Sequence, residues 1–198
     1  NEIIEKNSAY KSGQRDGAKF HISDSGGCYR ARIYKRLGIE PTRKIEIAGL
    51  RKMVAGDFFH TGLQQLLRRH GKLFLSETTV ESEHLLGHPD AVIQHEKEKI
   101  LAEFKTIEKF QMGYIRKTGA KEPHKLQMFT YWLLLRKELK DLDHAVLSYI
   151  KREDFETHDF YFTWSDEIHE QVKAEWTPLV KYWEEKTLPD CSCQILYD

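Results

Sequence analysis

The chain has 198 residues, of which 40% are hydrophobic and 31% charged, with equal numbers of acidic and basic side chains. This length is enough for one well-buried domain and too short for two large ones. The longest apolar run, residues 132–135, is far shorter than the roughly 20 residues that a membrane span requires. No basic-then-apolar leader opens the sequence. We therefore expect a single domain over 1–198, with no membrane span and no secretion.

The charge is unevenly distributed along the chain. Residues 1–75 contain 15 Lys or Arg against 7 Asp or Glu, whereas the remainder contains 16 against 24. A basic first part joined to an acidic second part favours an anionic ligand along one side, but a solvated surface of mixed charge explains it equally well. Composition alone therefore leaves nucleic-acid binding open.

Apolar periodicity predicts the elements in chain order. A period near 3.6, with start and stop signals such as Ser23 and Gly71, predicts helices over 24–37, 45–70, 123–139 and 166–186. A period near 2 predicts strands over 73–83, 87–95, 99–107, 143–151 and 157–164. Helices flanking a short mixed central sheet make the expected fold α/β or α+β.

Two charged residues interrupt the apolar run 100–107. Because side chains alternate faces along a strand, Glu103 and Lys105 point to the same side. Asp90 lies on the preceding predicted strand, across a hairpin whose turn includes residues 96–97. Two carboxylates from adjacent strands can hold Mg²⁺ or Mn²⁺, and a lysine beside them can orient an attacking water, lower its pKa or stabilise charge on a phosphate. The alternative is an ordinary charged sheet face, although charges in a core-like strand are costly unless paired or metal-bound.

Four short motifs follow one another along the chain: Gly56-Asp-Phe-Phe-His60, Gly87-His-Pro-Asp90, Glu103-Phe-Lys105 and Gln127-Met-Phe-Thr-Tyr131. Together they resemble the PD-(D/E)XK nuclease superfamily in its RecB-like branch. The resemblance implies a restriction-endonuclease-like core.

It also assigns roles to residues of this chain. The implied metal ligands are His60, Asp90, Glu103 and the backbone carbonyl of Phe104, and the implied catalytic residues are Asp90, Glu103, Lys105, Gln127 and Tyr131. Gln127 and Tyr131, one helical turn apart, would contact the DNA backbone or support the site. From the residues alone, His60 on an amphipathic helix and Tyr131 beside Trp132 fit packing in the core just as well.

The three cysteines, Cys28, Cys191 and Cys193, are too few for a disulfide framework. One cysteine before the nuclease core and a group after it resemble the iron–sulfur members of the same branch, which include CRISPR-adaptation exonucleases, helicase–nuclease subunits and phage relatives. The resemblance implies a [4Fe-4S] cluster that staples the region of Cys28 to the C-terminal end. The chain departs from that pattern: Tyr29 stands where the family usually has proline, one residue rather than two separates the last cysteines, and no fourth cysteine is present. Three unligated cysteines are the alternative.

Basic and aromatic side chains gather on the two helices predicted before the sheet. Cations bind phosphates and tyrosines stack on unpaired bases. The candidate nucleic-acid contacts are Arg30, Tyr34, Arg51 and Lys52. Solvated helix faces are the alternative for each of them.

We expect a Mg²⁺- or Mn²⁺-dependent deoxyribonuclease, an exonuclease or end-processing enzyme rather than a site-specific endonuclease. The resemblance implies that the substrate is single-stranded DNA or DNA with free ends. It also implies a cytoplasmic protein, encoded by a cell or by a phage, that acts in recombination, repair, phage DNA metabolism or CRISPR adaptation. The alternative is a catalytically silent nucleic-acid-binding or scaffold subunit of a larger helicase–nuclease-type complex, which the presence of all expected catalytic residues disfavours. A homo-oligomer and a helicase or integrase partner both stay open.

Overall fold

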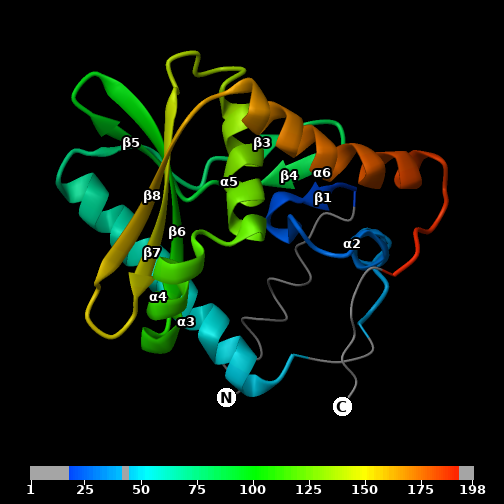
Figure 1. Cartoon of the computed structure of the whole chain (residues 1–198), viewed down its shortest axis with the longest axis horizontal. Coiled ribbons are helices and arrows are strands. Elements are labelled where there is room, and N and C mark those ends of the chain that lie inside the picture. The colour runs from blue at the N-terminus through cyan, green and yellow to red at the C-terminus, as the bar shows by residue number, and fades with distance from the viewer. Residues whose placement is uncertain (1–17, 42–44, 192–198) are drawn as a thin grey trace.

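The structure is a computed structural model that describes residues 18–41 and 45–191 (Figure 1). Its central sheet has five strands in the order β2-β5-β6-β7-β8. The strands are β2 Leu73–Leu75, β5 Ala91–His95, β6 Glu98–Ile107, β7 His144–Lys151 and β8 Thr157–Thr163. β6 and β7 pair in parallel and the other neighbours are antiparallel, so the sheet is mixed as expected.

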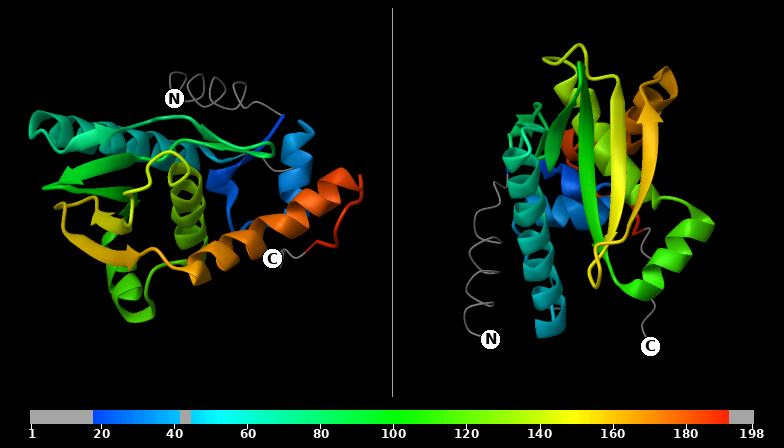
Figure 2. Two further views of the ribbon diagram at one scale, coloured as in Figure 1. Left: turned by 90° about the horizontal axis from the view of Figure 1, so that it is seen from above. Right: turned by 90° about the vertical axis from the view of Figure 1, so that its left-hand side faces the viewer.

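Helices cover both faces of this sheet, which explains why β7 is buried along nearly its whole length. The long helix α3, Ile47–Arg69, lies on one face (Figure 2). There its Leu63 and Leu67 pack against Phe104 and Ile150. Helices α4, Lys109–Thr118, and α5, Glu122–Leu135, form the crossover from β6 to β7 and cover the other face. The fold class is thus confirmed as α+β, with helices flanking a short mixed sheet.

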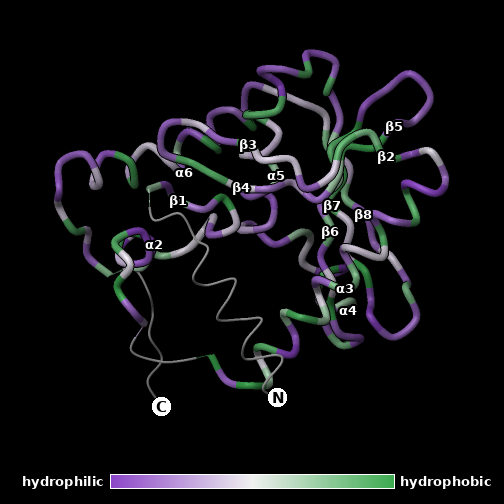
Figure 3. Tube along the Cα trace, turned by 180° about the vertical axis from the view of Figure 1, so that it is seen from behind, coloured by the Kyte–Doolittle hydropathy of each residue, from purple (hydrophilic) through white to green (hydrophobic). Residues whose placement is uncertain are grey.

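A smaller sheet lies beside α5, in the strand order β1-β4-β3. Its strands are β1 Phe20–His21, β3 Val80–Glu81 and β4 Leu85–Gly87. The short helix η1, Ile22–Asp24, and the helices α2, Tyr29–Arg36, and α6, Asp166–Glu184, pack nearby. Hydrophobic segments gather where the central strands meet, whereas the surrounding hairpins are mostly hydrophilic (Figure 3). Among the described helices, none combines the length and the apolarity needed to cross a membrane.

The structure corrects three predicted boundaries. The strand predicted over 73–83 is wrong, because this segment forms β2 and β3, which belong to different sheets. The strand predicted over 87–95 begins only at Ala91, since Gly87 pairs in the smaller sheet and Pro89 has no N–H to donate. The helix predicted from residue 24 begins at Tyr29, because Gly26 takes a left-handed conformation with φ 71°.

Helix α4 and strand β1 were not predicted. The helix carries a sequence signal that could have identified it: Glu108 and Gln111 form a capping box, in which each side chain accepts from the other's backbone N–H. Met112 and Ile115, three residues apart, bury its inner face.

Candidate active site

The candidate site lies where β5 and β6 part. Their pairing ends at Ala91 and Ala102, so residues 103–107 of β6 continue beyond β5 and leave one edge of that strand open. Asp90 lies at the start of this open edge, where its Oδ2 accepts a hydrogen bond from the backbone N–H of Phe104 at 2.7 Å. In a strand the N–H and C=O of one residue point to the same neighbour. The Phe104 carbonyl therefore faces the same open edge as Asp90.

Helix α3 runs past this open edge and contributes His60. The helix passes close to the strand at Gly56, where an added Cβ would make an ordinary contact of 3.8 Å with Thr106 Oγ1. His60 Nδ1 lies 3.1 Å from Asp90 Oδ1. Burial alone would lower the pKa of His60, but the hydrogen bond to Asp90 and the charges of Asp90 and Glu103 outweigh it, so the pKa rises.

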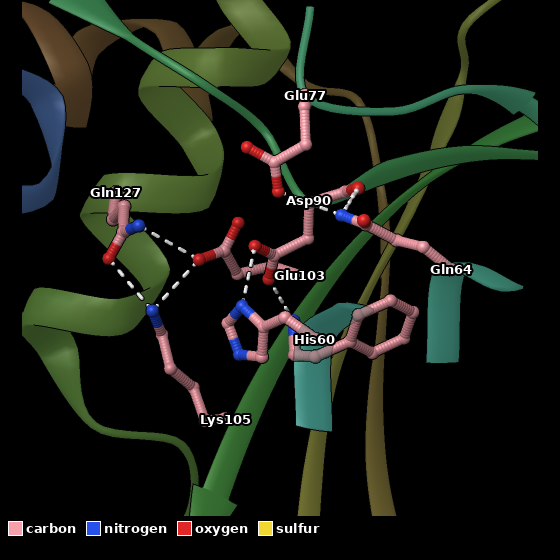
Figure 4. A network of polar contacts seen from close by, with 8 residues as sticks. His60, Gln64, Glu77, Asp90, Glu103, Lys105 and Gln127 are labelled. Carbon is pink, nitrogen blue, oxygen red and sulfur yellow. Dashed lines mark hydrogen bonds and ion pairs between the residues drawn. The ribbon is translucent and has the colours of Figure 1, made fainter. Parts of the chain in front are cut away.

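Glu103, Lys105 and Gln127 form a closed triangle of hydrogen bonds (Figure 4). Lys105 Nζ donates to Glu103 Oε1 at 2.8 Å and to Gln127 Oε1 at 2.9 Å, while Gln127 Nε2 donates to Glu103 Oε1 at 2.8 Å. The two charged residues meet because they are two apart on β6, and Gln127 reaches them from α5. Each polar group thus fixes the other two.

Glu103 is an unusually buried acid, with 1% of its surface exposed. Burial, and next the charge of Asp90, raise its pKa to about 7 and outweigh the stabilising charge of Lys105. Its second oxygen, Oε2, is buried and has no hydrogen-bond partner among the described residues. Burial alone would lower the pKa of Lys105, but Glu103 and Asp90 raise it, so this lysine stays charged.

The donor set suits a hard divalent cation such as Mg²⁺ or Mn²⁺, which prefers oxygen ligands. An ion beside Glu103 would give the unpaired Oε2 a partner and would offset the cost of burying its charge. Within residues 18–41 and 45–191, no three His, Cys, Asp or Glu side chains lie close enough together to hold a metal ion as they stand. The fit therefore rests on donor chemistry and on the orphaned oxygen.

Tyr131 lies beside this site but faces the interior, with 2% of its surface exposed. Its ring packs against Gly87, where an added Cβ would come 2.6 Å from Tyr131 Cε1. Burial, followed by the charge of Glu103, raises its pKa. Of the two roles expected for Tyr131, this placement fits support of the site and leaves no surface for the DNA backbone.

The candidate nucleic-acid contacts fall into two groups. Arg30 and Tyr34 lie on α2, where Arg30 Nε donates to Tyr34 Oη at 3.1 Å. This helix lies beside α6 and on the far side of α5 from β6, so the pair is not at the candidate site (Figure 1). Arg51 and Lys52 lie on α3 and are exposed; Lys52 pairs at 2.9 Å with Glu108, just past the end of β6.

Two cysteines, one near each end of the described chain, lie close together. Cys28 Sγ, at the start of α2, lies 3.9 Å from Cys191 Sγ. The segment that follows α6 thus returns to the beginning of the fold, as a staple between residue 28 and the C-terminal end would require. Cys193 lies outside the described residues.

Three polar residues near the site were missed. Gln64, one helical turn after His60 on α3, donates to the carbonyl of Asp90 at 2.9 Å and to Glu77 Oε1 at 2.8 Å. The spacing from His60 could have indicated Gln64, but Glu77 follows β2 in a loop and carries no sequence signal. His124 lies on α5 one turn before Gln127, and its Nδ1 is hydrogen-bonded to Tyr149 Oη at 2.9 Å. Burial, then the charges of Lys105 and Lys121, lower the pKa of His124 to about 4.

No family model and no curated protein matches this chain. Solved structures do. The protein SSO0001 superimposes with a TM-score of 0.57 at 18% identity, over 96% of this chain and 87% of its own. The alkaline exonuclease LHK-Exo from Laribacter hongkongensis gives 0.55 at 16% identity, over 88% and 95%. A phage-related exonuclease from Haemophilus somnus 129PT gives 0.53 at 14% identity, over 80% of each chain.

These similarities span most of both chains in each comparison. At these identities the similarity shows the fold alone, and the present chain has the fold of the alkaline and phage-related exonuclease structures. The fold implied by the four sequence motifs is therefore confirmed.

Proposed function

We propose that this chain, which shares its fold with solved exonuclease structures, is a divalent-metal-dependent nuclease of the PD-(D/E)XK type that hydrolyses the phosphodiester bonds of DNA. One observation carries the proposal: the buried Glu103, with its orphaned Oε2, lies beside Asp90 and is tied to Lys105 and Gln127 at the open edge of β6. A buried acid with a raised pKa that is hydrogen-bonded to a lysine is costly for stability and typical of a functional site.

Asp90, Glu103 and the Phe104 carbonyl would hold the ion, with His60 as a third side-chain ligand. When bound, Mg²⁺ or Mn²⁺ would supply a Lewis acid for the phosphate and lower the pKa of a water. The remaining chemistry belongs to residues of the chain itself.

Lys105 acts as a charged donor in this proposal. An ammonium group has three N–H donors, and two of them are used by Glu103 and Gln127. The third is left for a water or a phosphate oxygen, and the side chain is 19% exposed, so solvent can reach it. In the metal-free protein Glu103 and Asp90 raise the pKa of Lys105, and its ammonium group can orient a water and stabilise charge on a phosphate.

The substrate and the mode of cutting are part of the proposal. We infer exonuclease action, because the similar structures include an alkaline exonuclease, also solved with dAMP, and a phage-related exonuclease. Single-stranded DNA or free DNA ends as substrate follow from the resemblance of the sequence motifs. Lys52, next to Glu108 at the end of β6, is the best-placed of the candidate phosphate contacts. Pathway and partners, including a second copy, a helicase or an integrase, follow the resemblance alone.

A metal cluster at the cysteines belongs to the same proposal. Thiolates suit iron–sulfur and zinc ions, and the sulfurs of Cys28 and Cys191 already meet at 3.9 Å. Anaerobically purified protein should show a broad visible absorption band and contain iron, and Cys28→Ser should remove both. Absence of the band and of iron would refute the cluster.

The nuclease proposal is tested with end-labelled single- and double-stranded DNA in Mg²⁺ or Mn²⁺. The parent should cut, while Glu103→Ala and Lys105→Ala should not. Lys99→Ala is the matched control, since Lys99 lies on the same strand but pairs with Asp141 away from the site. Circular DNA should resist an exonuclease. If both site variants cut as fast as the parent, the assignment is wrong; if no metal supports cutting, the alternative of a silent binding subunit is favoured.

A further inference from the structure

Asp90 is held at three points. Its side chain accepts from the Phe104 N–H at 2.7 Å and contacts His60 at 3.1 Å, and its backbone carbonyl accepts from Gln64 Nε2 at 2.9 Å. The third contact is needed because Asp90 precedes β5, so no strand pairing is formed by its carbonyl. His60 and Gln64, one turn apart on α3, thus hold the two parts of the same residue.

The amide of Gln64 has two orientations that differ by exchange of its oxygen and nitrogen. In one of them an oxygen would face the carbonyl oxygen of Asp90, and the two acceptors would repel. The structure has the nitrogen there, and the same Nε2 also donates to Glu77 Oε1 at 2.8 Å. A carboxylate accepts and cannot donate, so Glu77 and the Asp90 carbonyl both favour the orientation of Gln64 that supports Asp90.

Glu77 reaches this position from an unfavourable backbone conformation. Its φ is 50°, in the left-handed region that costs a residue with a Cβ about 1 kcal/mol. The residue lies in the loop after β2 and is exposed, yet its carboxylate turns inward to Gln64, on the same side of the site as Asp90 (Figure 4). The hydrogen bond from Gln64 is made from this conformation and offsets part of its cost.

We infer that Glu77 is a positioning residue of the candidate metal site. It orients the Gln64 amide, which holds the Asp90 carbonyl and so directs the Asp90 carboxylate to the open edge of β6. The inference rests on the proposed function, because it takes Asp90 to be a metal ligand. Groups that orient metal ligands typically change metal affinity or activity by about 10- to 100-fold when removed.

The experiment compares Glu77→Ala with Glu77→Gln. Alanine removes one of the two acceptors that hold the Gln64 amide, whereas the glutamine oxygen can still accept from Gln64 Nε2. Mn²⁺ affinity is measured by calorimetry without DNA, and kcat and KM are measured with DNA at saturating Mn²⁺. We expect Glu77→Ala to weaken Mn²⁺ binding by about 10- to 100-fold and to lower kcat with little change in the KM for DNA, and Glu77→Gln to restore most of both.

Glu96→Ala is the matched control. Glu96 also has a positive φ, 53°, and is exposed, but it lies in the β5–β6 turn, and Gln94 donates to its backbone carbonyl, which alanine keeps. Its Mn²⁺ affinity should equal that of the parent. Thermal unfolding of each variant shows whether a loss of affinity reflects loss of the fold.

A double variant tests the route through Gln64. Gln64→Leu should weaken Mn²⁺ binding, and adding Glu77→Ala to it should cause no further loss, since the two residues then act through one contact. Additive losses, or a Glu77→Gln variant as impaired as Glu77→Ala, would mean that Glu77 contacts the ion itself and would overturn the inference. Unchanged affinity in Glu77→Ala, or no Mn²⁺ binding by the parent, would also overturn it. A parent that binds Mn²⁺ but cuts no DNA refutes the proposed function alone, because the affinities still test Glu77.

Discussion

Replacing Glu103 with glutamine removes a buried charge while keeping the size of the side chain and an oxygen that Lys105 and Gln127 can still reach. In the unfolded chain this carboxyl loses its proton near its ordinary pKa of 4.5, whereas in the metal-free folded protein its pKa is about 7. Between these values the folded protein holds a proton that the unfolded chain has released. Ionised Glu103 therefore costs stability as the pH rises through this range.

The size of the effect follows from the two pKa values. Each tenfold change in proton concentration corresponds to about 1.4 kcal/mol. The difference between a pKa of 4.5 and a pKa of about 7 therefore corresponds to about 3 kcal/mol. The free energy of unfolding of Glu103→Gln, relative to the parent, should therefore rise by about 3 kcal/mol between about pH 4 and pH 8. For a chain of this size that is a relative shift in Tm of about 6–12 °C.

The assay is urea unfolding in EDTA, followed by tryptophan fluorescence across this pH range, with Glu83→Gln as an exposed control. Any constant cost of placing the glutamine amide at the orphaned Oε2 position cancels, because only the change with pH is compared. A difference between Glu103→Gln and the parent that does not vary with pH, or that falls as pH rises, would refute the electrostatic account of this site.

A bound metal ion should offset the loss of stability that ionised Glu103 causes in the parent. An ion that binds the folded state at about 100 times its Kd adds about 2.7 kcal/mol of stability. Mg²⁺ or Mn²⁺ should thus stabilise the parent at about pH 8 and stabilise Glu103→Gln far less. Equal stabilisation of both proteins would place the ion elsewhere.

Three further predictions concern the surroundings of the site. Gly87→Ala should lower the free energy of unfolding by about 1–3 kcal/mol, because the new Cβ would come 2.6 Å from the Tyr131 ring. Urea unfolding measures the loss, and an unchanged midpoint would contradict the packing of Tyr131 against Gly87. Thr130→Val should lower the free energy of unfolding by about 1–3 kcal/mol, because the buried indole N–H of Trp176 donates to Thr130 Oγ1 at 2.8 Å and would lose its acceptor. Calorimetric unfolding measures the loss, with Thr163→Val as an exposed control. His124, whose pKa is about 4, should stay neutral from about pH 5 to 8 in histidine NMR spectra, and a titration near 6.5 would show that it is not buried as described.

Several features of the site followed from local geometry. The alternation of a strand predicted that Glu103 and Lys105 share a side, and the structure has them 2.8 Å apart. The hairpin turn at residues 96–97 is confirmed by the pairing of His95 with Glu98. Such relations are set by the backbone over a few residues, so the sequence alone suffices to predict them.

Other features depended on contacts between distant segments. Segment 73–83 has the period of one strand, but Glu77, in the left-handed conformation, separates two short strands that join different sheets. Arg30 and Tyr34 stay predicted nucleic-acid contacts, and the structure places them on α2, which packs against α6 and β1. Residue type and spacing cannot predict such placements, because burial and pairing with remote elements decide them.

Asp90, Glu103 and Lys105 illustrate both sides of this division. The sequence by itself determined the chemistry of the set and the shared face of its strand members, since both depend on residue type and on the two-residue repeat. Only the tertiary structure decided that β5 begins to pair with β6 at Ala91, which leaves open the edge where Asp90 lies, and that Glu103 is buried enough to raise its pKa to about 7. The physical reason is that desolvation and strand pairing are properties of the assembled core, to which α3, α5 and the sheet all contribute.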